Sequence, residues 1–214
     1  MLQYLHVGKK AGEKWLFADF NCEVRGGDYA WLDGGPGAGK SVLIDMAIGM
    51  DVPTTGAVFV DSASISKSGF AALQRIRRGI SLVRDDDRFD VISTVEWMEL
   101  GLWCGGKNRE QTRAFSREAV SRSGLRDLSD VAFCDLSGGQ RASLTLSRAL
   151  ARKPHLLLID WPGIFDFTFP AQLAGDFRQF LSDGGAVLAT GKPGGELADI
   201  HGRPVSLEPQ GASQ

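Results

Sequence analysis

The sequence has few cysteines, and the three that it contains lie far apart. Cys22, Cys104 and Cys134 form no closely spaced pair. An odd, scattered set of cysteines argues against a disulfide framework or a cysteine-ligated zinc site, and is typical of a reducing compartment. The 214 residues also lack an apolar run near the ~18 that a membrane-spanning helix needs. Charged residues at positions 9–14 interrupt the start of the chain, which therefore has no signal-peptide core.

Neither sign of charge is in clear excess. The chain has 24 Lys and Arg against 26 Asp and Glu, a formal net charge of −2. This balance gives no electrostatic case for binding nucleic acid or an anionic membrane. With 43% hydrophobic and 23% charged residues, the composition is that of an ordinary globular protein. We therefore expect a cytoplasmic protein of one large or two small domains, with no nucleic-acid partner.

Short apolar runs alternate with amphipathic segments along most of the chain. This alternation predicts an α/β fold with a mainly parallel sheet. From residue 94 to about 131 the pattern is helical, which indicates a helical insertion between two halves of the α/β core. The expected strands are residues 2–6, 16–24, 29–32, 80–83, 156–160, 186–190 and 205–207, with a short strand within 54–62. The expected helices are residues 42–50, 71–78, 109–124, 140–152 and 171–182, and residues 209–214 are expected to be disordered.

Residues 34–41 read GGPGAGKS and match the phosphate-loop pattern G-x-x-x-x-G-K-[ST]. Glycines at positions 34, 37 and 39 permit backbone conformations that turn N–H groups onto phosphate oxygens. A glycine-rich hairpin is the alternative, but an expected strand precedes the motif and an expected helix follows it. The predicted nucleotide-binding residues are Gly34, Gly35, Pro36, Gly37, Ala38, Gly39, Lys40, Ser41 and Val42.

Two carboxylate positions are candidates for a magnesium site beside this loop. Four apolar residues precede Asp160, so a buried strand would carry its carboxylate to one end of the sheet. Asp160 and the Ser41 hydroxyl are the predicted Mg²⁺ partners. Asp85 begins an acidic run, DDD, that is either a further metal or water ligand or a solvated turn, and charge runs are usually the latter.

A third motif, LSGGQR at residues 136–141, lies between the helical insertion and the acidic strand. The motif and the order of the elements resemble the ATP-binding-cassette (ABC) ATPases over nearly the whole chain. The resemblance implies one phosphate-loop ATPase domain over residues 1–214, with antiparallel N-terminal strands, a mainly parallel central sheet and a helical subdomain at about residues 94–135.

The same resemblance implies a head-to-tail dimer. ATP would lie between the phosphate loop of one domain and the signature motif of the other. The signature residues facing the partner's ATP would be Leu136, Ser137, Gly138, Gly139 and Gln140. Asp166 would be the interface aspartate, one residue closer to Asp160 than is typical of the family.

The sequence departs from the family pattern at several catalytic positions. Trp161 stands where a glutamate usually polarises the attacking water, and Gly191 stands where a histidine is usual. Tryptophan has no basic group, so it cannot act as a general base. Asp85 stands where a glutamine is usual.

The adenine-stacking aromatic of the family is also out of place. The register from the phosphate loop puts that position at Lys10–Ala11, which contains no aromatic residue. Tyr4 or Trp15 would serve if the loop were shifted.

The resemblance thus implies an ATP-binding subunit that works on the cytoplasmic face of a membrane with separate transmembrane subunits. Its second nucleotide-binding domain would be either another copy or an intact cassette. Because Trp161 and Gly191 replace the usual catalytic residues, we expect a degenerate site that binds ATP and Mg²⁺ but hydrolyses ATP weakly or not at all. The sequence leaves open whether the chain is an enzyme. The alternative is a non-catalytic scaffold or regulator, unconnected with transport, for which ATP is a dimerisation ligand.

Overall fold

The first two strands of the chain form a long antiparallel hairpin. The computed structural model describes residues 1–85, 92–103 and 109–207. In it, β1 (Leu2–Ala11) pairs with β2 (Lys14–Val24) on one side and with β4 (Thr55–Val60) on the other, and β5 (Ala63–Ser64) extends this sheet beyond β4. The predicted antiparallel N-terminal strands are therefore confirmed, and β1 runs five residues further than expected.

The second sheet has five strands in the order β6-β7-β8-β3-β9, and all of its pairings are parallel. Both faces of its inner strand β7 are covered, because all five residues of that strand are buried. The prediction of an α/β fold with a mainly parallel central sheet is confirmed. The strands are β3 (Tyr29–Asp33), β6 (Ile80–Arg84), β7 (Leu156–Asp160), β8 (Ala186–Ala189) and β9 (Arg203–Ser206).

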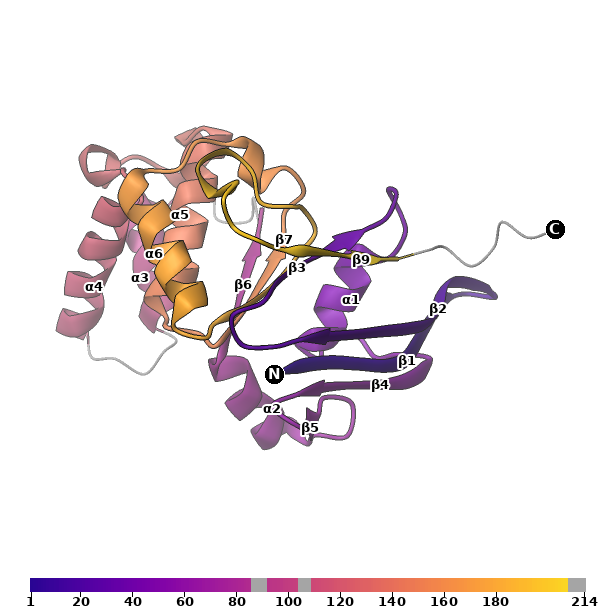
Figure 1. Ribbon diagram of the computed structural model, residues 1–214. Helices are drawn as coiled ribbons and strands as arrows, with labels where there is room; N and C mark the ends of the chain where they lie inside the picture. Colours follow the sequence, from indigo (N-terminus) through magenta and orange to yellow (C-terminus); the bar gives the residue numbers. More distant parts are fainter. Residues whose placement is uncertain (86–91, 104–108, 208–214) are drawn as a thin grey trace.

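The helices form layers on the two faces of the parallel sheet (Figure 1). Helix α1 lies between the two sheets, whereas α5 and α6 cover the opposite face, with α3 and α4 packed on the outside of α5. The helices are α1 (Lys40–Ala47), α2 (Phe70–Arg78), α3 (Thr94–Trp103), α4 (Arg109–Arg122), α5 (Gly138–Ala151) and α6 (Ala171–Ser182). The described residues also form four 3-10 turns between these elements: η1 (Arg126–Leu128), η2 (Phe133–Asp135), η3 (Ile164–Asp166) and η4 (Gly195–Leu197).

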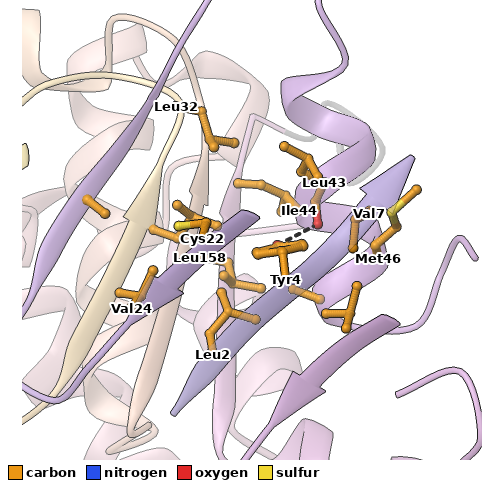
Figure 2. Close-up of a cluster of buried hydrophobic side chains, with 14 of the residues drawn as sticks. Leu2, Tyr4, Val7, Cys22, Val24, Leu32, Leu43, Ile44, Met46 and Leu158 are labelled. Carbon is orange, nitrogen blue, oxygen red and sulfur yellow. Dashed lines mark hydrogen bonds between the residues drawn. The ribbon is translucent and has the colours of Figure 1, made fainter. Parts of the chain in front are cut away.

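The core between the two sheets holds α1 in place. Figure 2 shows side chains from β1, β2 and β3 packed with those of α1 and β7. Within it, the fully buried hydroxyl of Tyr4 donates a hydrogen bond of 2.8 Å to the carbonyl oxygen of Leu43 in α1. Burial raises the pKa of the Tyr4 phenol well above its ordinary value. The N-terminal hairpin therefore fixes the helix that follows the phosphate loop.

A second apolar cluster, the helix-side core, lies between the parallel sheet and helices α5 and α6. Strand β7 feeds both cores by simple alternation, because Leu156 and Leu158 face α1 whereas Leu157 and Ile159 face the helix-side core. A third cluster, the insertion cluster, joins α3, α4 and α5 around Trp97, Met98 and Leu144. The division of residues 1–214 into one domain with a subdomain at 94–135 stays a prediction.

Within the described ranges, none of the helices combines the length and the apolar character that crossing a membrane requires. Helices α1 and α5 each begin two residues earlier than expected, because the residues of their first turns (Lys40 and Ser41, Gly138 and Gly139) are already helical. The expected disorder at residues 209–214 falls outside the described residues.

Candidate nucleotide-binding site

The phosphate loop connects β3 to α1 and depends on glycine at two positions. Gly37 and Gly39 have φ values of 76° and 98°, a region that other residues rarely adopt. A Cβ on Gly39 would also lie 2.7 Å from the ring of Phe17. Gly34 does not have a positive φ, and its part in turning N–H groups onto phosphate oxygens stays a prediction. Glycine is required there because a Cβ would lie 2.8 Å from the carbonyl oxygen of Leu207.

The two functional side chains that end the loop belong to the first turn of α1. Lys40 Nζ donates a hydrogen bond of 2.5 Å to the carbonyl oxygen of Gly34, so the ammonium bridges the two ends of the loop. Ser41 Oγ donates to Asp160 Oδ1 over 2.9 Å. Strand β8 lies between β3, which leads into the loop, and β7, which ends at Asp160. The side chains of Ser41 and Asp160 meet although these two strands are not neighbours.

The pair formed by Ser41 and Asp160 suits a magnesium ion held jointly with phosphates. Mg²⁺ prefers oxygen ligands and usually takes only one or two from the protein. Among the residues that the structure describes, no group of three or more His, Cys, Asp or Glu residues could hold a metal without such help. If Mg²⁺ binds here, phosphate oxygens of the nucleotide and water would complete its ligands.

The sequence reasoning missed a guanidinium beside this pair. Arg84 Nε and Nη2 donate to Asp160 Oδ2 over 3.0 and 2.7 Å, and Nη2 also donates to Asp45 Oδ1 over 2.9 Å. Burial alone would lower the pKa of Arg84, but the hydrogen bond to Asp45 and the charge of Asp160 outweigh it and raise that pKa. Arg84 and Asp160 end neighbouring strands in matching register. Only the strand order, which local patterns do not give, could have signalled this contact.

The other predicted ligand, Asp85, follows directly. Its side chain is 38% exposed, and its Oδ1 lies 3.8 Å from Nε of Arg141 in α5. A role for Asp85 with Mg²⁺ stays a prediction. The next two aspartates, at positions 86 and 87, lie outside the described residues.

The signature motif forms the capped N-terminus of α5. Ser137 Oγ accepts from the backbone N–H of Gln140 over 3.3 Å, and the backbone N–H of Ser137 donates to Gln140 Oε1 over 2.8 Å. This capping box leaves the hydroxyl proton of Ser137 able to donate to another group. A Cβ on Gly138 would lie 3.1 Å from the Phe167 ring, so glycine lets this ring pack against the motif. Leu136 is 4% exposed and anchors the motif in the insertion cluster.

Trp161 points into the protein and not into an open site. Its side chain belongs to the helix-side core and the residue is 8% exposed. Its ring meets that of Phe167 edge-on, with centroids 6.5 Å apart. Trp161 therefore packs in the core beside Asp160, and its side chain has no group that could act as a base.

The remaining predicted positions lie nearby on loops. The Tyr29 hydroxyl donates to the carbonyl oxygen of Gly191 over 2.8 Å, and a Cβ on Gly191 would come no closer than 3.9 Å to other atoms. Asp166 is exposed at the end of η3. Roles for Gly191 and Asp166 in a dimer stay predictions.

The structure removes one of the two aromatic candidates for stacking on adenine. Tyr4 is fully buried and bonded to α1, so it cannot reach a nucleotide, and that alternative was wrong. Trp15 is 36% exposed, with the ammonium of Lys10 4.9 Å from the centre of its ring. Trp15 remains the candidate.

Comparison with known proteins gives one family match and many relatives. The family described as "ABC transporter" matches residues 17–163. Similar curated proteins include the methionine import ATP-binding protein of Vibrio vulnificus, 32% identical over 66% of this chain and 42% of that protein. The lipoprotein-releasing system ATP-binding protein of Chromohalobacter salexigens is 31% identical over 65% of this chain and 60% of its own length. The chain spans about half the length of the curated relatives it matches.

Solved structures give the same fold. A dimeric ATP-binding cassette in a post-hydrolysis state, bound to ADP and Pi, superposes with a TM-score of 0.79 at 22% identity, covering 97% of this chain and 94% of that one. A nucleotide-free ATP-binding cassette from an ABC transporter gives a TM-score of 0.70 at 20% identity, covering 88% and 80%.

Proposed function

The chain belongs to the ABC transporter family, and from that premise we propose that it is the ATP-binding subunit of a membrane transport complex with a degenerate site of its own. This site binds ATP with Mg²⁺ and hydrolyses ATP weakly or not at all. The observation that carries the proposal is the contrast between Trp161 and its surroundings. The loop glycines, Lys40 and the bonded pair of Ser41 and Asp160 are in place, whereas the next residue is a buried indole.

The missing general base determines how far the rate of ATP hydrolysis should fall. Removing a general base costs about 10²–10⁴-fold in rate, so binding would survive while turnover fell. Gly191 adds to the defect, since its lack of a side chain leaves no group to contact the γ-phosphate. Such a subunit would act chiefly through nucleotide-dependent association.

The proposed association is with a second nucleotide-binding domain, through the signature motif. The N–H groups of Gly138 and Gly139, in the first turn of α5, and the positive end of the helix dipole suit a phosphate supplied by the partner, as does the hydroxyl proton of Ser137. In a pair with an intact cassette, this motif would complete the working site. In a pair of identical chains, both sites would be impaired. Asp166, exposed on η3, would lie in the interface.

The proposed membrane partners are separate transmembrane subunits, with this chain on the cytoplasmic face. The relatives named as import or lipoprotein-releasing ATP-binding proteins support a transport role of this kind. The second candidate is a non-catalytic scaffold or regulator. The burial of Trp161 supports this second candidate as well as the first. A buried apolar residue at that position is compatible with a protein that never hydrolyses ATP.

Binding and turnover test the proposal together. We expect the purified chain to bind ATP by calorimetry, to lose binding in Lys40→Ala, and to show ATP turnover near background. Turnover at an ordinary transporter rate that Lys40→Ala abolishes would show that the site is not degenerate. Co-purification with a membrane subunit would support the transport role over the scaffold.

A further inference from the structure

The metal side of the proposed site contains a positive charge that belongs to the protein. Asp160 uses both carboxylate oxygens: Oδ1 accepts from Ser41 at 2.9 Å, and Oδ2 accepts twice from Arg84 at 3.0 and 2.7 Å. Its side chain is 6% exposed, so few other partners can reach it. The carboxylate that would face Mg²⁺ is therefore already paired with a cation.

The charges at this place can be counted. Asp160 and Asp45 contribute two negative charges, and Arg84 bonds to both and contributes one positive charge, which leaves a net charge of −1. Without the guanidinium the same pair would carry −2. A guanidinium stays protonated in proteins, so this charge is permanent. The arrangement both weakens the attraction for a divalent cation and reduces the repulsion that the aspartates exert on phosphates.

The placement of Arg84 argues for more than a structural ion pair. The residue ends β6 in register with Asp160 at the end of β7, so its charge lies at the same edge of the sheet as the bond to Ser41. Its side chain is 31% exposed, so the charge is open to a ligand at this edge. An ion pair with a purely structural role would not need to lie beside the phosphate loop.

We infer that Arg84 is a positioning residue and a built-in cation of the nucleotide site: it holds Asp160 on Ser41 and makes ATP binding depend little on Mg²⁺. The inference rests on the proposed function, since it requires that the phosphate loop binds ATP. The ligand of the nucleotide site is then the triphosphate of ATP, with or without the metal.

Calorimetric titration of the full chain with a non-hydrolysable ATP analogue, in MgCl₂ and in EDTA, tests the inference. We expect the wild-type affinity to change by less than about threefold between the two conditions. In Arg84→Gln the ratio should rise to about tenfold or more, because the uncompensated carboxylates then repel metal-free phosphates. Arg84→Lys keeps the charge, so its ratio of affinities in MgCl₂ and in EDTA should stay near that of the wild type.

Arg122→Gln is the matched control. Arg122 donates two hydrogen bonds to the Asp176 carboxylate and is 37% exposed, but it joins α4 to α6. Its loss should leave the magnesium ratio unchanged. Thermal unfolding of each variant shows whether it is folded.

Three results would overturn the inference. One is a wild-type ratio above about tenfold, which needs no variant and so decides the matter even if Arg84→Gln does not fold. Another is the same ratio in wild type and Arg84→Gln. The third is no binding in either condition, which overturns the proposed function as well, whereas the first two results leave that function standing.

Discussion

At the scale of single residues, Trp161 has two consequences that the sequence did not separate. Absence of a base could be read from the residue type alone. Burial could not, because a position next to a metal-site aspartate suggests an open site. In the structure the indole is 8% exposed and packs with Phe167 and the helix-side core. Replacing it therefore affects folding as well as chemistry.

Trp161→Glu should destabilise the protein and fail to restore catalysis. Loss of a large buried side chain costs about 3–5 kcal/mol, and a carboxylate in an apolar cluster adds to this. For a chain of this size the melting temperature should fall by about 6–20 °C, measured by calorimetry or circular dichroism. The buried glutamate would also have a raised pKa, which makes it a poor partner for water activation.

Trp161→Phe is the control, because it keeps an apolar ring and leaves only a small cavity, so it should cost less stability than the change to glutamate. An unchanged melting temperature in Trp161→Glu together with faster ATP turnover would contradict this account. That pair of results would mean that the site lacks only its base.

At the scale of elements, the sequence predicted best where one pattern was unbroken. Strand Leu156–Asp160 and helix Ala171–Ser182 have the expected bounds because each shows a single strong periodicity. Helix α5 begins at Gly138, which helix propensity disfavours, because the cap at Ser137 and the contact with Phe167 outweigh that cost. Arg84 was missed for a different reason, since its contact with Asp160 exists only once β6 and β7 are paired.

The insertion cluster offers a test at this scale. Trp97 of α3 stacks on Phe133 of η2 with ring centroids 4.5 Å apart and lies 3.3 Å below the Arg148 guanidinium of α5. Three elements around the signature motif thus share one aromatic ring. Trp97→Ala should cost about 3–5 kcal/mol and raise amide exchange in α3 and in the first turn of α5.

Leu100→Ala, on the same helix but 46% exposed, is the control and should stay within about 0.5 kcal/mol. Amide exchange followed by mass spectrometry measures both variants. Equal effects of the two substitutions would show that the stack does not hold these elements together.

At the scale of the whole molecule, the two halves of the proposed ATP site lie on different elements of one chain. The phosphate loop precedes α1 between the sheets, and the signature begins α5 on the other face of the parallel sheet (Figure 1). If each ATP is shared between two chains, a defect in the loop of one chain and a defect in the signature of the other should complement each other.

Mixing two variants tests this sharing. Lys40→Ala removes the loop ammonium, and Ser137→Glu places a like charge where the partner's phosphate would lie, so neither variant alone should dimerise with ATP. A mixture keeps one complete site, formed by the loop of the Ser137→Glu chain and the signature of the Lys40→Ala chain. It should therefore recover ATP-dependent dimers, measured by sedimentation velocity. If Ser137→Glu alone dimerises like the wild type, the signature does not contact a partner's ATP and the head-to-tail arrangement is wrong.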